Sequence, residues 1–343
     1  MSEPLRKKKS YPINKPLAEY LQKHGRTIEL PLNYSELKKY TGSVIVRDKH
    51  KKDSLWETAL YPTSEVDYIH TGLKQIYSIL KTGGDFSVHE HLHIERVDYC
   101  TFGNSNPFRV KIVNNFNDNY DYFYIKQADS SRIYGLELEH ILSPSRIHFY
   151  ANQTTLIEEH IAGIPGDQFI QHHLNNPEFN SVRIAKEFVK FNERCFVRLL
   201  GDMRSYNFVF DITPDFDEVQ FRIRAIDFDQ QCYEGRSKFY LPQFFKENNP
   251  LVELVMNLLS KETVAQYQKE ERTLIAQRSI SSRFRLNELV GIMETDEISP
   301  IEHIQSLAAD LSLHYKDDSF LKAASMGQIV RHCLRHLTSH IRK

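Results

Sequence analysis

The sequence predicts an α+β fold in two parts, a small antiparallel sheet followed by a larger, mainly helical part. Segments rich in Tyr, Phe, Ile and Val follow one another between about residues 90 and 127, which is typical of strands. After about residue 156, apolar residues at helical spacing dominate. A length of 343 residues is enough for two lobes. We expect an N-terminal extension of unknown role at 1–70, an N-lobe at 71–155 and a C-lobe at 156–343.

Composition and charge narrow the class of protein. The chain has 44 Lys and Arg against 45 Asp and Glu, so it lacks the basic surplus of a nucleic-acid-binding protein. No run approaches the roughly 18 apolar residues of a membrane span. Four cysteines without a CxxC pair disfavour a zinc ribbon or a disulfide framework and indicate reduced thiols. We expect a cytoplasmic protein with neither nucleic acid nor membrane among its partners.

The N-lobe pattern begins with a helix at 70–84, HTGLKQIYSILKTGG, which Gly83 and Gly84 should stop. Three strands should follow at 91–99, 107–113 and 120–127. SSRIYGLELEHILSP at 130–144 then predicts a single helix that ends at Pro144.

The most informative stretch for chemistry is LLGDMRSYNFVFD, residues 199 to 211. The helix predicted at 180–200 delivers Asp202 to its carboxyl end, and NFVFDI and VQFRIRAID read as two strands joined by the turn residues TPDFDE. In such a hairpin the start of the first strand lies beside the end of the second, so Asn207 should lie next to Asp227. Asp202, Asn207 and Asp227 should therefore converge.

Two carboxylates and an amide oxygen in a small volume repel or go unsatisfied unless a cation lies among them. Hard oxygen ligands of this kind suit Mg²⁺, which leaves its remaining positions to water and substrate phosphates. The pattern therefore indicates a protein that handles nucleotide phosphates.

DxxxxN, a hairpin and IDFD together resemble the catalytic loop and metal-binding segment of the protein-kinase-like fold superfamily, nearest to its aminoglycoside phosphotransferase and choline kinase branch. The resemblance implies a two-lobed protein-kinase-like fold that binds ATP and Mg²⁺ between its lobes. Asp202 would be the catalytic base and Arg204 would contact phosphate. Asn207 and Asp227 would hold the metal, assisted by Asp229.

The same resemblance extends upstream to the segment LIEEHIAGIPGDQF at 156–169, which is similar to the hinge of those enzymes. The backbone near Glu158 would receive the adenine edge, which makes Glu159, His160 and Ile161 candidate nucleotide-binding residues.

A strand lysine that bridges two phosphates is also implied, and Lys126 is the residue that matches. A helix glutamate would hold it in place, and spacing leaves Glu137 and Glu139 equally open. Lys111 is a weaker substitute for Lys126, since no helix follows its strand.

Departures from the family pattern leave alternatives. Leu200 stands where the branch has His, and the candidate phosphate loop TFGNSNPF contains only Gly103. A pseudokinase or scaffold that binds nucleotide without transferring phosphate fits these departures, as does an enzyme that transfers a different part of the nucleotide. The expected function is an ATP-dependent phosphotransferase whose acceptor hydroxyl belongs to an unidentified small molecule or protein.

A rival from another class is a cupin-like metal-binding barrel. Gly83, His89, His91 and Glu95 nearly follow the first cupin motif, and alternate histidines on a strand suit a transition metal. The second cupin motif is not visible downstream. A His-rich exposed strand explains the same residues without a metal.

Overall fold

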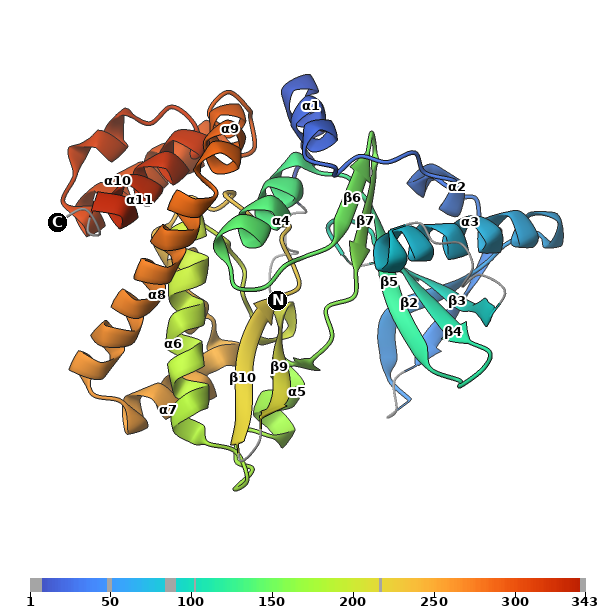
Figure 1. Ribbon diagram of the computed structural model, residues 1–343, viewed down its shortest axis with the longest axis horizontal. Helices are drawn as coiled ribbons and strands as arrows, with labels where there is room; N and C mark the ends of the chain where they lie inside the picture. The colour runs from blue at the N-terminus through green and yellow to red at the C-terminus, as the bar shows by residue number, and fades with distance from the viewer. Residues whose placement is uncertain (1–7, 48–50, 84–90, 102, 216–217, 340–343) are drawn as a thin grey trace, which may run out of the picture. The chain divides into compact units, whose positions relative to one another are not determined.

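The computed structural model describes residues 8–47, 51–83, 91–101, 103–215 and 218–339 (Figure 1). The chain divides into two compact units. The first unit comprises Met1–Ser130 and Ile147–His160, and the second unit comprises Ser131–Arg146 and Ile161–Lys343. The chain therefore crosses from one unit to the other three times. No helix among the described residues is long and apolar enough to cross a membrane.

The first unit is built on a seven-stranded antiparallel sheet with the strand order β1-β2-β3-β4-β5-β7-β6. The strands are β1 (Gly42–Arg47), β2 (Asp53–Leu60), β3 (Leu92–Cys100), β4 (Phe108–Asn114), β5 (Tyr120–Gln127), β6 (Phe149–Asn152) and β7 (Thr155–Glu159). β3, β4 and β5 confirm the three predicted strands. In β4, Phe108, Val110 and Ile112 are buried and alternate with half-buried charged residues, as a strand with one covered face requires.

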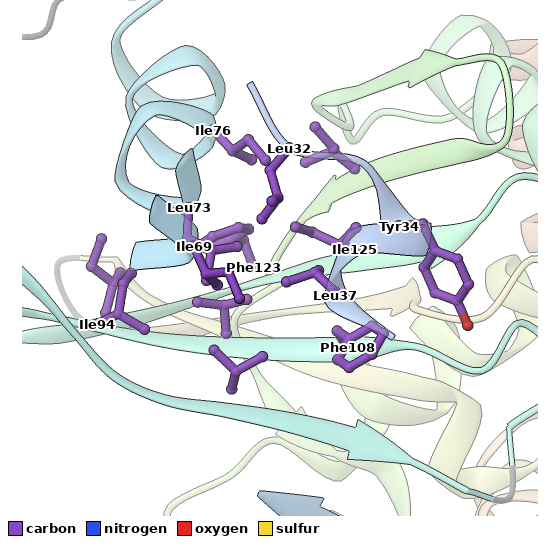
Figure 2. Packing of buried hydrophobic residues seen from close by; sticks show 14 of the residues in the cluster. Leu32, Tyr34, Leu37, Ile69, Leu73, Ile76, Ile94, Phe108, Phe123 and Ile125 are labelled. Atoms are coloured by element: carbon purple, nitrogen blue, oxygen red, sulfur yellow. The ribbon is translucent and has the colours of Figure 1, made fainter. Parts of the chain in front are cut away.

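Helix α3 covers one face of this sheet. The helices of the first unit are α1 (Lys15–Lys23), α2 (Tyr34–Leu37) and α3 (Thr63–Thr82). Figure 2 shows Ile69, Leu73 and Ile76 of α3 packed with side chains of the strands in one apolar cluster. Gly83 ends α3 in the left-handed region at φ 66°, as predicted, because a residue without Cβ adopts that conformation without strain. Gly84 lies outside the described residues.

Residues expected to form an N-terminal extension contribute to the first unit. β1 and β2 are the first two strands of the sheet, and Leu32 and Leu37 lie in its core with no exposed area. Most side chains of β1 are exposed, so the strand carries no buried-and-exposed alternation. This is the physical reason why β1 is not predicted from the sequence.

The second unit is mainly helical. Its helices are α4 (Ser130–Leu142, of which all but Ser130 belongs to this unit), α5 (Gly166–His172), α6 (Ser181–Arg198), α7 (Asn249–Leu258), α8 (Lys261–Ser281), α9 (Arg283–Met293), α10 (Ile301–Tyr315) and α11 (Met326–Ser339). A three-stranded antiparallel sheet accompanies them, ordered β10-β9-β8, with β8 (Ile164–Pro165), β9 (Phe208–Asp215) and β10 (Glu218–Ala225). The predicted helices at 130–144 and 180–200 and the predicted hairpin are confirmed.

Helix α6 begins at a capped end and carries the core of the second unit. The Asn180 side chain accepts hydrogen bonds from the backbone N–H groups of Val182 and Arg183, which satisfies donors that the first turn leaves unpaired. Along the helix, Phe188 and Phe191 are buried, and each contributes about 1.5–3 kcal/mol through the apolar area removed from water. The predicted combination of an antiparallel sheet with many helices is confirmed, whereas the two-lobed arrangement of a kinase stays a prediction.

Candidate active site

A tightly bonded loop follows α6 and carries the first candidate catalytic residue. Leu199 ends the helix in the left-handed region at φ 56°. Its carbonyl accepts a hydrogen bond from the N–H of Cys232 at 2.8 Å, and the N–H of Gly201 donates to the carbonyl of Gln230 at 3.3 Å. The loop before Asp202 is therefore tied to the segment that follows Asp227.

Asp202 and Asn207 are joined directly. The Asn207 amide nitrogen donates to the Asp202 carbonyl oxygen at 2.7 Å and lies 3.4 Å from the carboxylate Oδ2. Asp202 itself has φ 55°, a left-handed conformation that Asp tolerates better than most residues. Because the nitrogen of Asn207 is engaged with Asp202, its Oδ1 is the atom left to bind a cation.

The hairpin brings Asn207 beside the segment of Asp227, as its geometry predicts. Ala225 pairs with Phe208 at the end of the ladder, and the N–H of Ile226 donates to the Asn207 carbonyl at 3.0 Å. Asp227 is the next residue. The structure therefore places Asp202, Asn207 and Asp227 together, and their chemical roles stay predictions.

Charged neighbours surround the Asp202 carboxylate. Arg204 donates from Nε to Asp202 Oδ1 at 2.9 Å and from Nη1 to Glu247 at 2.6 Å. Burial is the largest influence on Asp202 and raises its pKa, the contact with Arg204 opposes this, and the negative charge of Asp227 adds to the increase. The net result is a carboxylate more basic than an ordinary Asp. Arg204 pairs with carboxylates in the structure, and its contact with phosphate stays a prediction.

Arg132, which the sequence analysis did not single out, contacts both acids of the IDFD segment. This residue of α4 is 1% exposed, and its Nη1 donates to Asp227 Oδ1 at 2.9 Å and to Asp229 Oδ1 at 2.7 Å. The N–H of Asp229 also donates to Asp227 Oδ1 at 2.9 Å. A buried guanidinium is costly unless carboxylates compensate its charge, and here two of them do.

The donor set of Asn207, Asp227 and Asp229 fits Mg²⁺ by its chemistry. All three supply hard oxygens, and the engaged nitrogen of Asn207 leaves its oxygen for a cation. No group of three or more His, Cys, Asp or Glu suited to a metal occurs among the described residues. An Mg²⁺ site with one or two carboxylates does not need such a group, because substrate phosphates and water complete it.

In the first unit, Lys126 has a carboxylate partner that the sequence analysis placed in another role. Its Nζ lies 2.8 Å from Glu158 Oε2, and both side chains are at least nine-tenths buried. The Lys126 ammonium also lies 5.3 Å from the centroid of the Tyr124 ring. Because β5 and β7 are hydrogen-bonded neighbours, sheet register alone brings the two charges together.

The two helix glutamates proposed to hold Lys126 pair with arginines within the second unit. Glu137, which has no exposed area, makes a bidentate contact with Arg285 at 2.7 and 2.8 Å. Glu139 is 4% exposed and pairs with Arg198. Both contacts belong to the packing of α4 against its neighbouring helices. A pair between Lys126 and either glutamate would join the two units and stays a prediction.

The hinge-like segment begins as the expected strand, β7, and leads to α5. The N–H of Glu159 donates to the carbonyl of His148 at 3.1 Å, so this donor already has a partner in the sheet. His160 Nδ1 lies 3.3 Å from the Tyr124 hydroxyl, and burial lowers the pKa of its imidazole. Ile161 is 8% exposed. Adenine binding by these three residues stays a prediction.

The cupin-like interpretation is wrong for the described residues. The seven-stranded sheet has unpaired edges at β1 and β6, whereas a barrel requires closure. Glu95 pairs with Lys111 at 2.8 Å, and the ring of His91 packs against Phe116. His89 lies outside the described residues. A half-exposed, His-rich strand accounts for the motif.

Arg132 and Glu158 are the residues that sequence analysis missed. No residue pattern distinguishes Arg132, because SSRIYGLELEHIL mixes polar and charged residues with apolar ones, and the structure shows that nearly all of them are buried. Glu158 becomes the partner of Lys126 only through the pairing of β7 with β5, which the structure shows.

Comparison with known proteins identifies no family. No family model matches the sequence, and no curated protein matches it. The autoinhibited serine kinase domain of the giant muscle protein titin is similar in structure at 14% identity and a TM-score of 0.27, over 70% of this chain and 92% of that domain. Titin kinase with its flanking domains is similar at 12% identity and a TM-score of 0.26, over 71% of this chain and 54% of that one. At TM-scores this low, the likeness supports neither a shared fold nor a shared activity.

Proposed function

We propose that this protein is an ATP-dependent phosphotransferase that transfers the γ-phosphate to a hydroxyl of a small-molecule or protein acceptor. The observation that carries the proposal is that Asp202, Asn207 and Asp227 lie close together at the base of one hairpin. The Asn207 amide nitrogen donates a hydrogen bond to the Asp202 carbonyl at 2.7 Å. A carboxylate for the acceptor proton thus lies beside hard oxygen ligands for a phosphate-bound cation.

The residues of the second unit divide this chemistry between them. Asp202 would orient the acceptor hydroxyl and receive its proton, and its raised pKa makes it a better base. Arg204 would hold the Asp202 carboxylate in position through its contact at 2.9 Å. Asn207, Asp227 and Asp229 would hold Mg²⁺, which when bound supplies positive charge to the phosphates.

Nucleotide binding would also use Lys126 and the segment from Glu159 to Ile161. Lys126 is the proposed contact of the α- and β-phosphates, and the segment Glu159 to Ile161 is the proposed adenine contact. All four cysteines lie in the described part of the chain and none forms a disulfide, which supports the proposed cytoplasmic location.

The test is a thermal shift of the purified protein with ATP, with and without Mg²⁺. A ligand at 100 times its Kd stabilises the folded state by about 2.7 kcal/mol. We expect ATP to raise the Tm only with Mg²⁺, and Asp227→Ala to abolish that dependence. Asp211→Ala is the matched control, because the Asp211 and Asp227 side chains are 37% and 36% exposed, and Asp211 lies in the hairpin that Asp227 directly follows. No shift with ATP under any condition would contradict the proposal.

The contacts of Arg132 favour a second candidate, a nucleotide-binding pseudokinase. Its guanidinium already compensates the charge of Asp227 and Asp229, so nucleotide could bind without a metal and without transfer. This candidate predicts that ATP raises the Tm equally in Mg²⁺ and in EDTA. It also predicts that wild-type protein forms no more ADP from ATP than Asp202→Ala does.

A further inference from the structure

The Asp227 and Asp229 carboxylates already share a cation of the chain itself. Arg132 Nη1 reaches one Oδ1 of each, at 2.9 and 2.7 Å. A single nitrogen therefore contacts both carboxylates, which are the groups that would hold a divalent metal ion. The guanidinium side chain is 1% exposed, and arginine keeps its charge in proteins.

The position of Arg132 is fixed by close packing of α4 on the segment that carries the two acids. The Ser131 hydroxyl donates to the Gln231 carbonyl at 2.5 Å. One turn further along, a Cβ at Gly135 would lie 3.1 Å from the Cβ atoms of Phe228 and Gln231. A side chain at Gly135 would require Phe228 or Gln231 to move by a few tenths of an ångström, so the helix backbone approaches the segment of the two acids closely and holds Arg132 against them.

Mg²⁺ or Mn²⁺ would need some of the same carboxylate oxygens. Two cations cannot share them without repulsion, and a small divalent ion also requires near-octahedral geometry. Asp227 is 36% exposed at its side chain, so solvent and a metal have access to it, whereas Asp229 is only 10% exposed. Entry of a metal would therefore weaken the contacts of Arg132, beginning at Asp227.

We propose that Arg132 is a resident counter-cation that competes with divalent metal at Asp227 and Asp229 and so keeps the metal affinity of the unliganded protein low. The inference rests on the proposed function in one respect, the use of Asp227 as a metal ligand. Binding of metal and withdrawal of Arg132 are then two sides of one equilibrium.

The experiment is a Mn²⁺ titration of the full chain without nucleotide, followed by the electron paramagnetic resonance signal of free Mn²⁺. We expect Arg132→Gln to bind Mn²⁺ at least about tenfold more tightly than wild type. Arg132→Lys keeps the charge and should bind Mn²⁺ as weakly as wild type. Arg132→Gln combined with Asp227→Asn should lose the gain.

Arg285→Gln is the matched control, because it also removes a buried arginine–carboxylate contact of α4 but leaves Asp227 and Asp229 untouched. Its Mn²⁺ affinity should equal that of wild type. Equal Mn²⁺ affinity in folded Arg132→Gln and wild type would overturn the inference. If Arg132→Gln does not fold, the Kd of wild-type protein for Mn²⁺ is the test. A Kd below about 100 μM that Asp227→Asn abolishes would overturn the inference, and weaker Mn²⁺ binding would support it.

Failure of the inference and failure of the proposed function are separated by ATP. Stabilisation by ATP and Mg²⁺ with no effect of Arg132→Gln on Mn²⁺ binding would overturn the role of Arg132 and leave the phosphotransferase standing. Tighter Mn²⁺ binding by Arg132→Gln with no response to ATP in any variant would support the competition and contradict the phosphotransferase.

Discussion

In the first unit the buried ammonium of Lys126 pairs with Glu158 on a neighbouring strand, whereas in the second unit the buried guanidinium of Arg132 reaches Asp227 from a helix 95 positions earlier. The first pair follows from sheet register, since Lys126 lies opposite Leu156 and Glu158 is two residues along the same face. The second needs a helix packed on a loop. A charge pair set by strand pairing thus requires only that two strands lie side by side, whereas one set by helix packing requires a helix to pack on a loop distant in sequence.

The largest effect that we expect from a substitution in either unit is on turnover, and it falls in the second unit because the proposed proton acceptor lies there. Asp202→Ala should lower the transfer rate by roughly 10² to 10⁴, the usual scale for a positioned acid or base. Stabilisation by ATP should persist, since Asp202 is outside the proposed metal ligands. ADP formation and thermal shift, measured on the same sample beside Asp211→Ala, check this. A parallel loss of ATP binding and turnover would remove Asp202 from its role.

Removing one partner of a buried charge pair should lower the free energy of unfolding most in the second unit. Arg285→Met leaves Glu137, which has no exposed area, and should lower the free energy of unfolding by roughly 3–4 kcal/mol. Urea unfolding measures the loss, and hydrogen exchange should locate it in α4 and α9. Arg283→Met, an exposed neighbour on the same helix, is the control and should change little. An equal loss of hydrogen-exchange protection in the sheet of the first unit would contradict the division of the chain into two compact units.

The corresponding change in the first unit should cost less. Lys126→Met should lower the free energy of unfolding by about 2–3 kcal/mol, because Glu158 keeps 7% of its side-chain surface and so some hydration. Lys111→Met provides the comparison within the same sheet. Its partner Glu95 is 43% exposed, so the loss should stay below about 1 kcal/mol. Equal losses for the two lysines would show that burial does not distinguish them.

The smallest effect expected depends on pH. Burial raises the pKa of Glu193 to about 7, against the opposing attraction of Arg272. Between the ordinary pKa of Glu and about pH 7, the folded state binds more protons than the unfolded state, so stability falls as the pH rises through this window. Glu193→Gln should remove that fall and stabilise the protein at pH 8 by on the order of 1–2 kcal/mol relative to its effect at pH 5. Urea unfolding at both pH values measures this, and a gap that does not grow with pH would contradict it.

Elements with strong periodic patterns could be predicted from the sequence. β5, α6 and the β9–β10 hairpin follow from alternation or helical spacing, and the meeting of Asn207 with Asp227 follows from hairpin geometry alone. β1 could not be predicted, because its mostly exposed side chains carry no pattern. It becomes a strand only through pairing with β2.

The partners of buried charges were harder to predict than the charges themselves. Lys126 was singled out, but Glu158 was assigned to a hinge, because nothing in the sequence orders β7 beside β5. Arg132 is not predicted as a site residue, because its helix mixes charged and apolar residues and only the folded structure shows that nearly all of them are buried. Tertiary packing supplies this information, and residue patterns do not.

The three crossings of the chain between its units also set an order of events during synthesis. Residues 131–146 belong to the second unit, yet they emerge from the ribosome before β6 and β7 complete the sheet of the first. At a synthesis rate of about 5–20 residues per second, the aspartates 95 and 97 residues downstream are made roughly 5–20 s after Arg132. During that interval the apolar residues of α4, such as Ile133, Leu136 and Leu138, lack their packing partners, and exposed apolar surface of this kind is what chaperones bind. For the same reason, a fragment that begins at residue 161 lacks α4 and would leave Asp227 and Asp229 without their arginine.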